Sequence, residues 1–189
     1  MCASIWNENV LKRFKSVEND STFEKRYYAP YNKLLNSIFP SNTNFTVSPV
    51  AYPVDSRDSI DFAVEYLITI EEHDQNTPVL FIEIKDPTTL SSLASRRSAN
   101  DQMIHRFEQL INTCHIPILY GISAFGTKIL IYTLNIETGD LNPTFPPPHP
   151  HKININITKD TWNLDILENE GAVVLNNVFT HVMQMCNEL

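Results

Sequence analysis

The most apolar stretch of this chain runs from Thr77 to Lys85 and has the sequence TPVLFIEIK. Its β-branched and aromatic residues predict a strand. The preceding segment Ser59–Ile70 has a similar composition, and the polar residues 71–76 between the two segments predict a hairpin turn. Two charged residues, Glu83 and Lys85, interrupt the apolar strand near its end. Side chains alternate along a strand, so these two point to one face, about 7 Å apart along the chain.

The segments around this hairpin predict helices and further strands. Helical spacing of apolar residues predicts an N-terminal helical region over Ile5–Phe39, which Pro30 should kink or split. The segment Leu90–Cys114 also has a helical period, and a crossover of this length can lead into parallel pairing. Additional strands are predicted at Phe45–Tyr52, Ile116–Ser123 and Lys128–Asn135. We therefore expect an α/β fold, with a mixed central sheet flanked by helices.

The chain has 189 residues, enough for one domain with a sizeable core. We expect a single domain over residues 1–189, with its core at about 20–136. A Pro-rich loop is predicted over 143–151, and a long amphipathic C-terminal helix over about 164–187.

Composition excludes several classes of protein. No apolar stretch is long enough to span a bilayer, and the N-terminal residues lack the pattern of a secretory signal. Three widely spaced cysteines argue against a disulfide framework, so we expect an intracellular protein, cytoplasmic or nuclear, with no membrane partner. Only four glycines occur, and none form a phosphate-binding loop. The net charge of −8 counts against broad charge-driven binding of nucleic acid, but not against a local basic patch or a metal site.

The charged residues of the hairpin predict a site. A turn centred near His73 places Asp61 opposite Glu83 or Lys85 on one face. Two carboxylates this close repel each other unless a cation lies between them, and Mg²⁺ prefers oxygen ligands. A neighbouring ammonium can orient a water or stabilise developing charge, so the set suits metal-assisted hydrolysis of a phosphodiester. The alternative is a solvated strand face.

The order of these motifs resembles the PD-(D/E)XK nuclease superfamily, which has the restriction-endonuclease-like fold. The residues that carry the resemblance are SIDFAV at 59–64, FIEIK at 81–85 and Asp101-Gln102 at the start of a helical segment. The resemblance covers roughly Phe23 to Asn135. Within the superfamily, the chain is similar to standalone nuclease domains and to the nuclease domains of Crinkler-type effectors. The resemblance implies a nuclease that uses Mg²⁺ or Mn²⁺ and acts on DNA or RNA.

The resemblance also implies roles for the hairpin residues. Asp61 and Glu83 match the two metal ligands of the family, and the Ile84 carbonyl matches a third. Lys85 matches the lysine that positions or activates the attacking water. The proline that gives the family its name is replaced by Ile60, a change that the family tolerates.

Residues on the helical segments complete the implied site. Gln102 resembles the helix glutamine of the exonuclease-type branch. Glu24 is the best match for the glutamate of the first helix, and Glu18 is the second choice. Arg106 replaces the tyrosine that often follows the glutamine by four positions, and its guanidinium could bind a phosphate.

Paired basic residues follow the apolar strand and are candidates for contacts with nucleic acid. Arg96 and Arg97 could bind the phosphate backbone beside a metal site; the alternative is a solvated helix start. A second function therefore remains open, in which the fold is a catalytically silent module for binding or oligomerisation. The acidic net charge and the apolar C-terminal helix favour that alternative, and a homodimer is one expectation because many proteins of this fold dimerise.

Overall fold

The computed structural model describes residues 5–17, 25–50, 65–72, 75–146 and 157–189. Within these ranges, seven strands form one mixed sheet in the order β1-β2-β3-β4-β5-β6, with β7 also pairing with β5. β3 and β4 are parallel, and the other neighbouring pairs are antiparallel. The strands are β1 (Phe45–Val50), β2 (Glu65–Glu72), β3 (Gln75–Lys85), β4 (Ile118–Phe125), β5 (Lys128–Asn135), β6 (Leu141–Asn142) and β7 (Leu164–Asp165).

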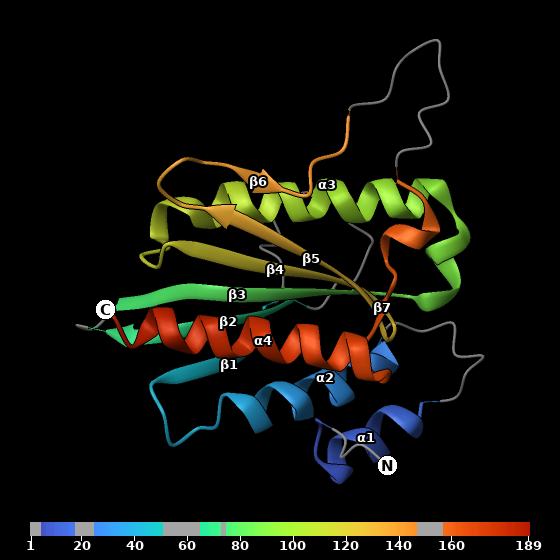
Figure 1. Cartoon of the computed structure of the whole chain (residues 1–189), viewed down its shortest axis with the longest axis horizontal. Helices are drawn as coiled ribbons and strands as arrows, with labels where there is room; N and C mark the ends of the chain where they lie inside the picture. Colours follow the sequence, from blue (N-terminus) through green and yellow to red (C-terminus); the bar gives the residue numbers. More distant parts are fainter. Residues whose placement is uncertain (1–4, 18–24, 51–64, 73–74, 147–156) are drawn as a thin grey trace.

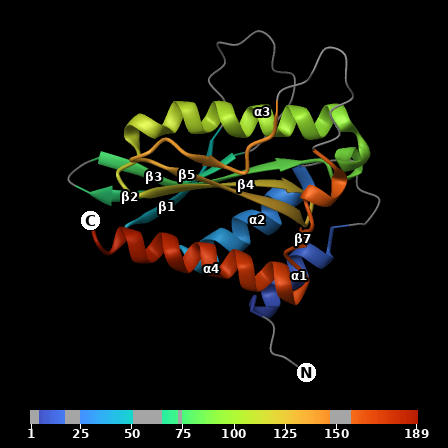
Figure 2. The same ribbon diagram turned by 45° about the horizontal axis from the view of Figure 1, so that its top comes forward.

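Helices cover both faces of this sheet (Figure 1). α3 lies across one face, and α4 lies across the other together with α1 and α2 (Figure 2). The helices are α1 (Glu8–Lys15), α2 (Lys25–Ile38), α3 (Leu93–Leu110) and α4 (Asn169–Cys186), and short 3₁₀ helices occupy Pro87–Ser91, Ile111–Thr113 and Lys159–Thr161. The sheet is therefore the middle of three layers, and its central strands are shielded from water on both sides.

Alternation along β3 divides its side chains between the two layers. The Phe81 ring contacts Phe107 of α3 edge-on, with the ring centroids 4.9 Å apart. Residues two positions apart share this face, so Glu83 and Lys85 also lie on the α3 side of the sheet. α3 packs closely on β4 because Gly121 has no side chain: a Cβ there would lie 2.6 Å from Met103 Cε. As a result, α3 covers this face of β3 and β4.

The expected mixed α/β sheet with flanking helices is confirmed, including the hairpin and the parallel crossover. Of the two outcomes expected at Pro30, a kink or a split, the split is wrong, because α2 continues through Pro30 from Lys25 to Ile38. The C-terminal helix begins at Asn169 instead of about 164, because Leu164–Asp165 pairs with β5 as β7. Within the described ranges, no helix is long and apolar enough to cross a membrane.

Candidate active site

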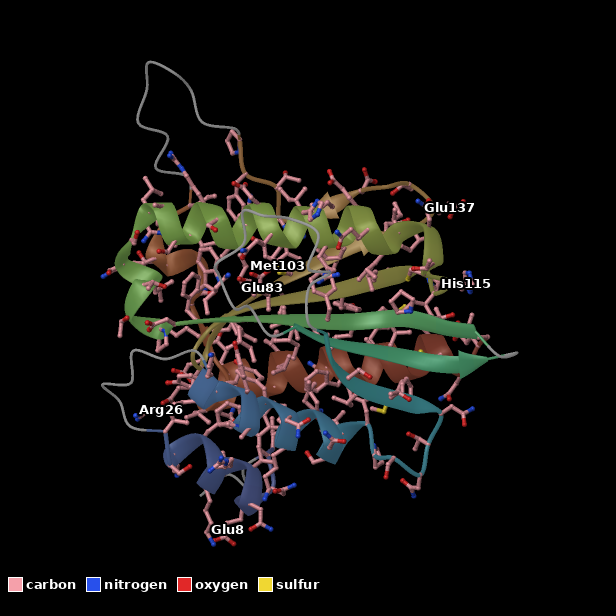
Figure 3. The ribbon with its side chains drawn as sticks, turned by 180° about the vertical axis from the view of Figure 1, so that it is seen from behind. Glu8, Arg26, Glu83, Met103, His115 and Glu137 are labelled. Carbon is pink, nitrogen blue, oxygen red and sulfur yellow. The ribbon has the colours of Figure 1, made fainter. Side chains whose placement is uncertain are left out.

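The structure places a carboxylate and an ammonium together beneath α3. Lys85 Nζ lies 3.0 Å from Glu83 Oε1, and the side chains are 11% and 0% exposed respectively. Figure 3 shows Glu83 and Met103 between α3 and the sheet. Glu83 and Lys85 are two positions apart on a central strand, so both charged groups lie on the same covered face of the sheet.

This burial overturns the interpretation of Glu83 and Lys85 as a solvated strand face. Moving a carboxylate out of water is expensive unless a cation and hydrogen bonds compensate for the lost hydration. The ion pair with Lys85 supplies that cation. Replacing such a pair by apolar residues is often neutral or stabilising, so its presence on the central strand is more informative about function than about stability.

α3 contributes an amide and a guanidinium from one of its flanks. Gln102 and Arg106 lie one helical turn apart, on the side of α3 away from Asn100. Gln102 Oε1 is buried and has no hydrogen-bond partner among the described residues. Arg106 is 7% exposed, and its Nη1 donates a hydrogen bond of 2.9 Å to Gln109 Oε1. The helix thus adds a buried acceptor and a buried positive charge to the α3 layer.

Two strand residues that sequence reasoning did not assign to the site also lie in this layer. Ser123 is the β4 partner of Glu83 in the parallel register, is fully buried, and accepts a hydrogen bond of 3.2 Å from Trp162 Nε1. Tyr132 of β5 donates a hydrogen bond of 3.1 Å to Asn100 Oδ1. Burial raises the pKa of Tyr132, and the negative charge of Glu83 raises it further. The signal that could have identified these residues is the parallel register, which local sequence patterns do not contain.

The hairpin register differs from the prediction. Glu65 is the partner of Glu83, so Asp61 does not occupy that position. The turn lies between Glu72 and Gln75, and an irregularity after Ile68 shifts the pairing by one further residue. Together these changes move the pairing by two positions from the predicted register.

The other predicted carboxylates, Asp61, Glu24 and the second choice Glu18, lie outside the described residues. The Ile84 side chain is fully buried and, by alternation, lies on the face opposite Glu83. Among the described residues, no group of three or more His, Cys, Asp or Glu side chains is placed to hold a metal ion. Glu83 is therefore the single predicted carboxylate ligand that the described ranges contain.

The two arginines predicted to contact nucleic acid are not equivalent. Arg96 is 8% exposed, and its guanidinium donates hydrogen bonds to the carbonyl oxygens of Ile157, at 2.8 Å, and Leu90, at 2.6 Å. These contacts tie α3 to the 3₁₀ helix Pro87–Ser91 and to the segment at Ile157, so Arg96 has a structural role in the fold. Arg97 is half-buried and lines a groove beside Asn100, on the flank of α3 away from Gln102. Neither arginine extends the Gln102 and Arg106 flank.

The fold and the buried pair define an α/β protein with a mixed sheet and a charged group enclosed under its crossover helix. No protein-family model matches the chain. No curated protein matches it significantly, and neither does any solved structure. The function of the chain is therefore inferred from the geometry and chemistry of the described residues.

Proposed function

We propose that this chain is a metal-dependent nuclease of the restriction-endonuclease-like fold, which hydrolyses phosphodiester bonds in DNA or RNA. The observation that carries the proposal is the ion pair of Glu83 and Lys85, 3.0 Å apart and enclosed on the central strand. Carboxylates and ammonium groups that are held out of water interact more strongly with reacting charges than they do at a surface.

The described residues fit a divalent ion in part. Glu83 offers a carboxylate, and the resemblance adds Asp61 and the Ile84 carbonyl as the remaining protein ligands of Mg²⁺ or Mn²⁺. When bound, such an ion polarises the phosphate and lowers the pKa of a coordinated water. The buried Gln102 Oε1, which has no hydrogen-bond partner among the described residues, supports the fit because it can accept a hydrogen bond from a water in this layer.

Each described residue has a distinct task in this proposal. The Lys85 ammonium orients the attacking water and stabilises negative charge that develops on the phosphate. Gln102 holds that water in position through its amide oxygen. Arg106, with its charge held in the α3 layer by Gln109, binds a phosphate oxygen of the substrate.

The test is cleavage by the purified full chain of single- and double-stranded DNA and RNA, with Mg²⁺ or Mn²⁺. We expect Lys85→Ala to lower the rate by about 10²-fold or more, the loss typical when one group that stabilises developing charge is removed. Lys33→Ala, on the exposed side of α2, is the matched control and should retain the full rate. Equal rates for Lys85→Ala and the parent chain would assign the cleavage to a contaminant and refute the proposal.

A second candidate function is a catalytically silent module that binds nucleic acid or protein. The observation that favours it is that Lys85 already offsets the charge of Glu83, while Glu83 is 0% exposed. The C-terminal helix does not add support, because its apolar residues Leu175, Phe179 and Val182 are buried within the protein's own core. Titration calorimetry with Mn²⁺ separates the candidates: saturable binding that Glu83→Gln abolishes favours the nuclease, and no binding favours the silent module.

A further inference from the structure

The groove beside Arg97 and Asn100 lies on the flank of α3 away from Gln102. It has a volume of about 210 Å³ and opens between α3 and the segment at Phe145. Drug-sized ligands occupy about 300–1,000 Å³, so this groove has room for one ring system. Its walls are formed by Arg97, Asn100, Asp101, Ile104, Phe145, Pro146 and Ile157.

The polar end of the groove presents a donor beside an acceptor. Asn100 is 5% exposed, and its Oδ1 accepts the hydrogen bond from Tyr132. Its Nδ2 faces Asp101 and donates to Asp101 Oδ1 at 3.4 Å, a long bond that leaves the amide free to serve a better acceptor. A carboxylate can only accept from Asn100, so Asp101 fixes the orientation of the amide. The groove therefore offers amide N–H groups next to a carboxylate that is exposed to solvent.

The rest of the groove is apolar and held in place. Phe145 is half-buried and packs against the core, and Ile104 contributes an aliphatic wall from α3. Pro146 extends the aromatic side with a rigid ring. Flat heteroaromatic rings bind to such surfaces by stacking on them, while their edges form hydrogen bonds with nearby polar groups.

We propose that this groove binds a guanine base. The Watson–Crick edge of guanine presents one carbonyl acceptor beside two N–H donors. The carbonyl O6 accepts from Asn100 Nδ2, and the N1–H and N2–H groups donate to the two oxygens of Asp101. The ring lies against Phe145, and the positive charge of Arg97 attracts the attached phosphate.

The other three bases match this edge less well. Adenine and uracil each present one N–H donor where Asp101 can accept two, and cytosine presents two acceptors where Asn100 offers the single amide. The inference goes beyond the proposed nuclease because it requires neither a metal ion nor Lys85. It describes a site on the opposite flank of α3 from Gln102.

The experiment is titration calorimetry of the full chain with 5′-GMP, 5′-IMP, 5′-AMP, 5′-CMP and 5′-UMP. We expect 5′-GMP to bind best. 5′-IMP lacks the N2 amino group and should bind about tenfold more weakly, which is the scale of one lost base contact. Equal affinity for all five nucleotides, or no binding at millimolar 5′-GMP, would overturn the proposal.

Variants locate the site. Asp101→Asn is a nearly isosteric change at an exposed position, and we expect it to weaken 5′-GMP about tenfold while leaving the circular dichroism spectrum unchanged. Glu108→Gln, an exposed carboxylate two turns further along α3 and outside this groove, should bind 5′-GMP as the parent does. Equal weakening by both variants would refute the assignment. Binding of 5′-GMP should be unchanged when EDTA removes divalent ions, whereas nuclease activity should be lost, so failure of the nuclease proposal and failure of this one are distinguishable.

Discussion

Replacing Lys85 by methionine removes the ammonium that lies 3.0 Å from Glu83 Oε1 but keeps a side chain of similar length. The Glu83 side chain is 0% exposed and that of Lys85 is 11% exposed, so solvent cannot easily screen the carboxylate that remains. Breaking a buried ion pair by removing one partner costs about 3–5 kcal/mol. We expect the free energy of unfolding at neutral pH to fall by about that amount.

Urea unfolding followed by tryptophan fluorescence measures this difference. Lys12→Met is the matched control, because Lys12 forms an ion pair of 2.8 Å with Glu8 in which the side chains are 67% and 79% exposed. Exposed pairs contribute about 0–1 kcal/mol, so this variant should unfold almost as the parent does. The double variant Glu83→Gln with Lys85→Met should recover most of the loss, since neither charge remains. A cost for Lys85→Met no greater than that for Lys12→Met would refute the reasoning.

Three further predictions follow from the packing. Gly121→Ala places a methyl group 2.6 Å from Met103 Cε and should destabilise the fold by about 1–3 kcal/mol in urea unfolding, and an unchanged midpoint would contradict the tight α3 contact. Burial raises the pKa of the Cys114 thiol to about 11 and that of Cys186 to about 12, so alkylation at pH 8 mapped by mass spectrometry should modify either thiol only after denaturation. Burial and the charge of Glu83 raise the pKa of Tyr132, so its contribution to stability is complete below about pH 10 and is lost as the pH rises further. Tyr132→Phe has no hydroxyl to ionise, so it should lose less stability than the parent as the pH rises above about 10, as followed by circular dichroism. Identical pH profiles would contradict this.

Local patterns were sufficient to predict the layers of the fold, because alternation and helical periodicity follow directly from burial. They were not sufficient where distant segments decide the outcome. Leu164–Asp165 is a strand because β5 offers it a partner, and no feature within those two residues requires this. The continuity of α2 through Pro30 likewise depends on packing, since Pro30 is buried and the tertiary contacts outweigh its poor helical propensity.

The candidate site was predictable in chemistry but only in part in geometry. Glu83 and Lys85 share a face because a strand alternates, and the structure confirms that they meet. The pairing of Glu83 with Glu65 and with Ser123 depends on the bulge and on the parallel crossover, which are tertiary features. Arg96 has the same charge as Arg97, yet its guanidinium donates to the carbonyl of Ile157, 61 residues further along the chain, as well as to that of Leu90.

The distribution of positive charge bears on how this protein would bind a polyanion. The net charge is −8, and the described cations in the α3 layer already have protein contacts: Lys85 with Glu83, Arg106 with Gln109, and Arg96 with two carbonyls. The logarithm of the affinity for duplex DNA falls linearly with the logarithm of the salt concentration, and each phosphate that a protein neutralises steepens this slope by about 0.9. Few such contacts are available in the α3 layer, so the affinity of the proposed nuclease should vary only weakly with salt concentration and strongly with divalent ions. A steep salt dependence without divalent ions would instead indicate that nucleic acid binds to a basic surface outside the α3 layer.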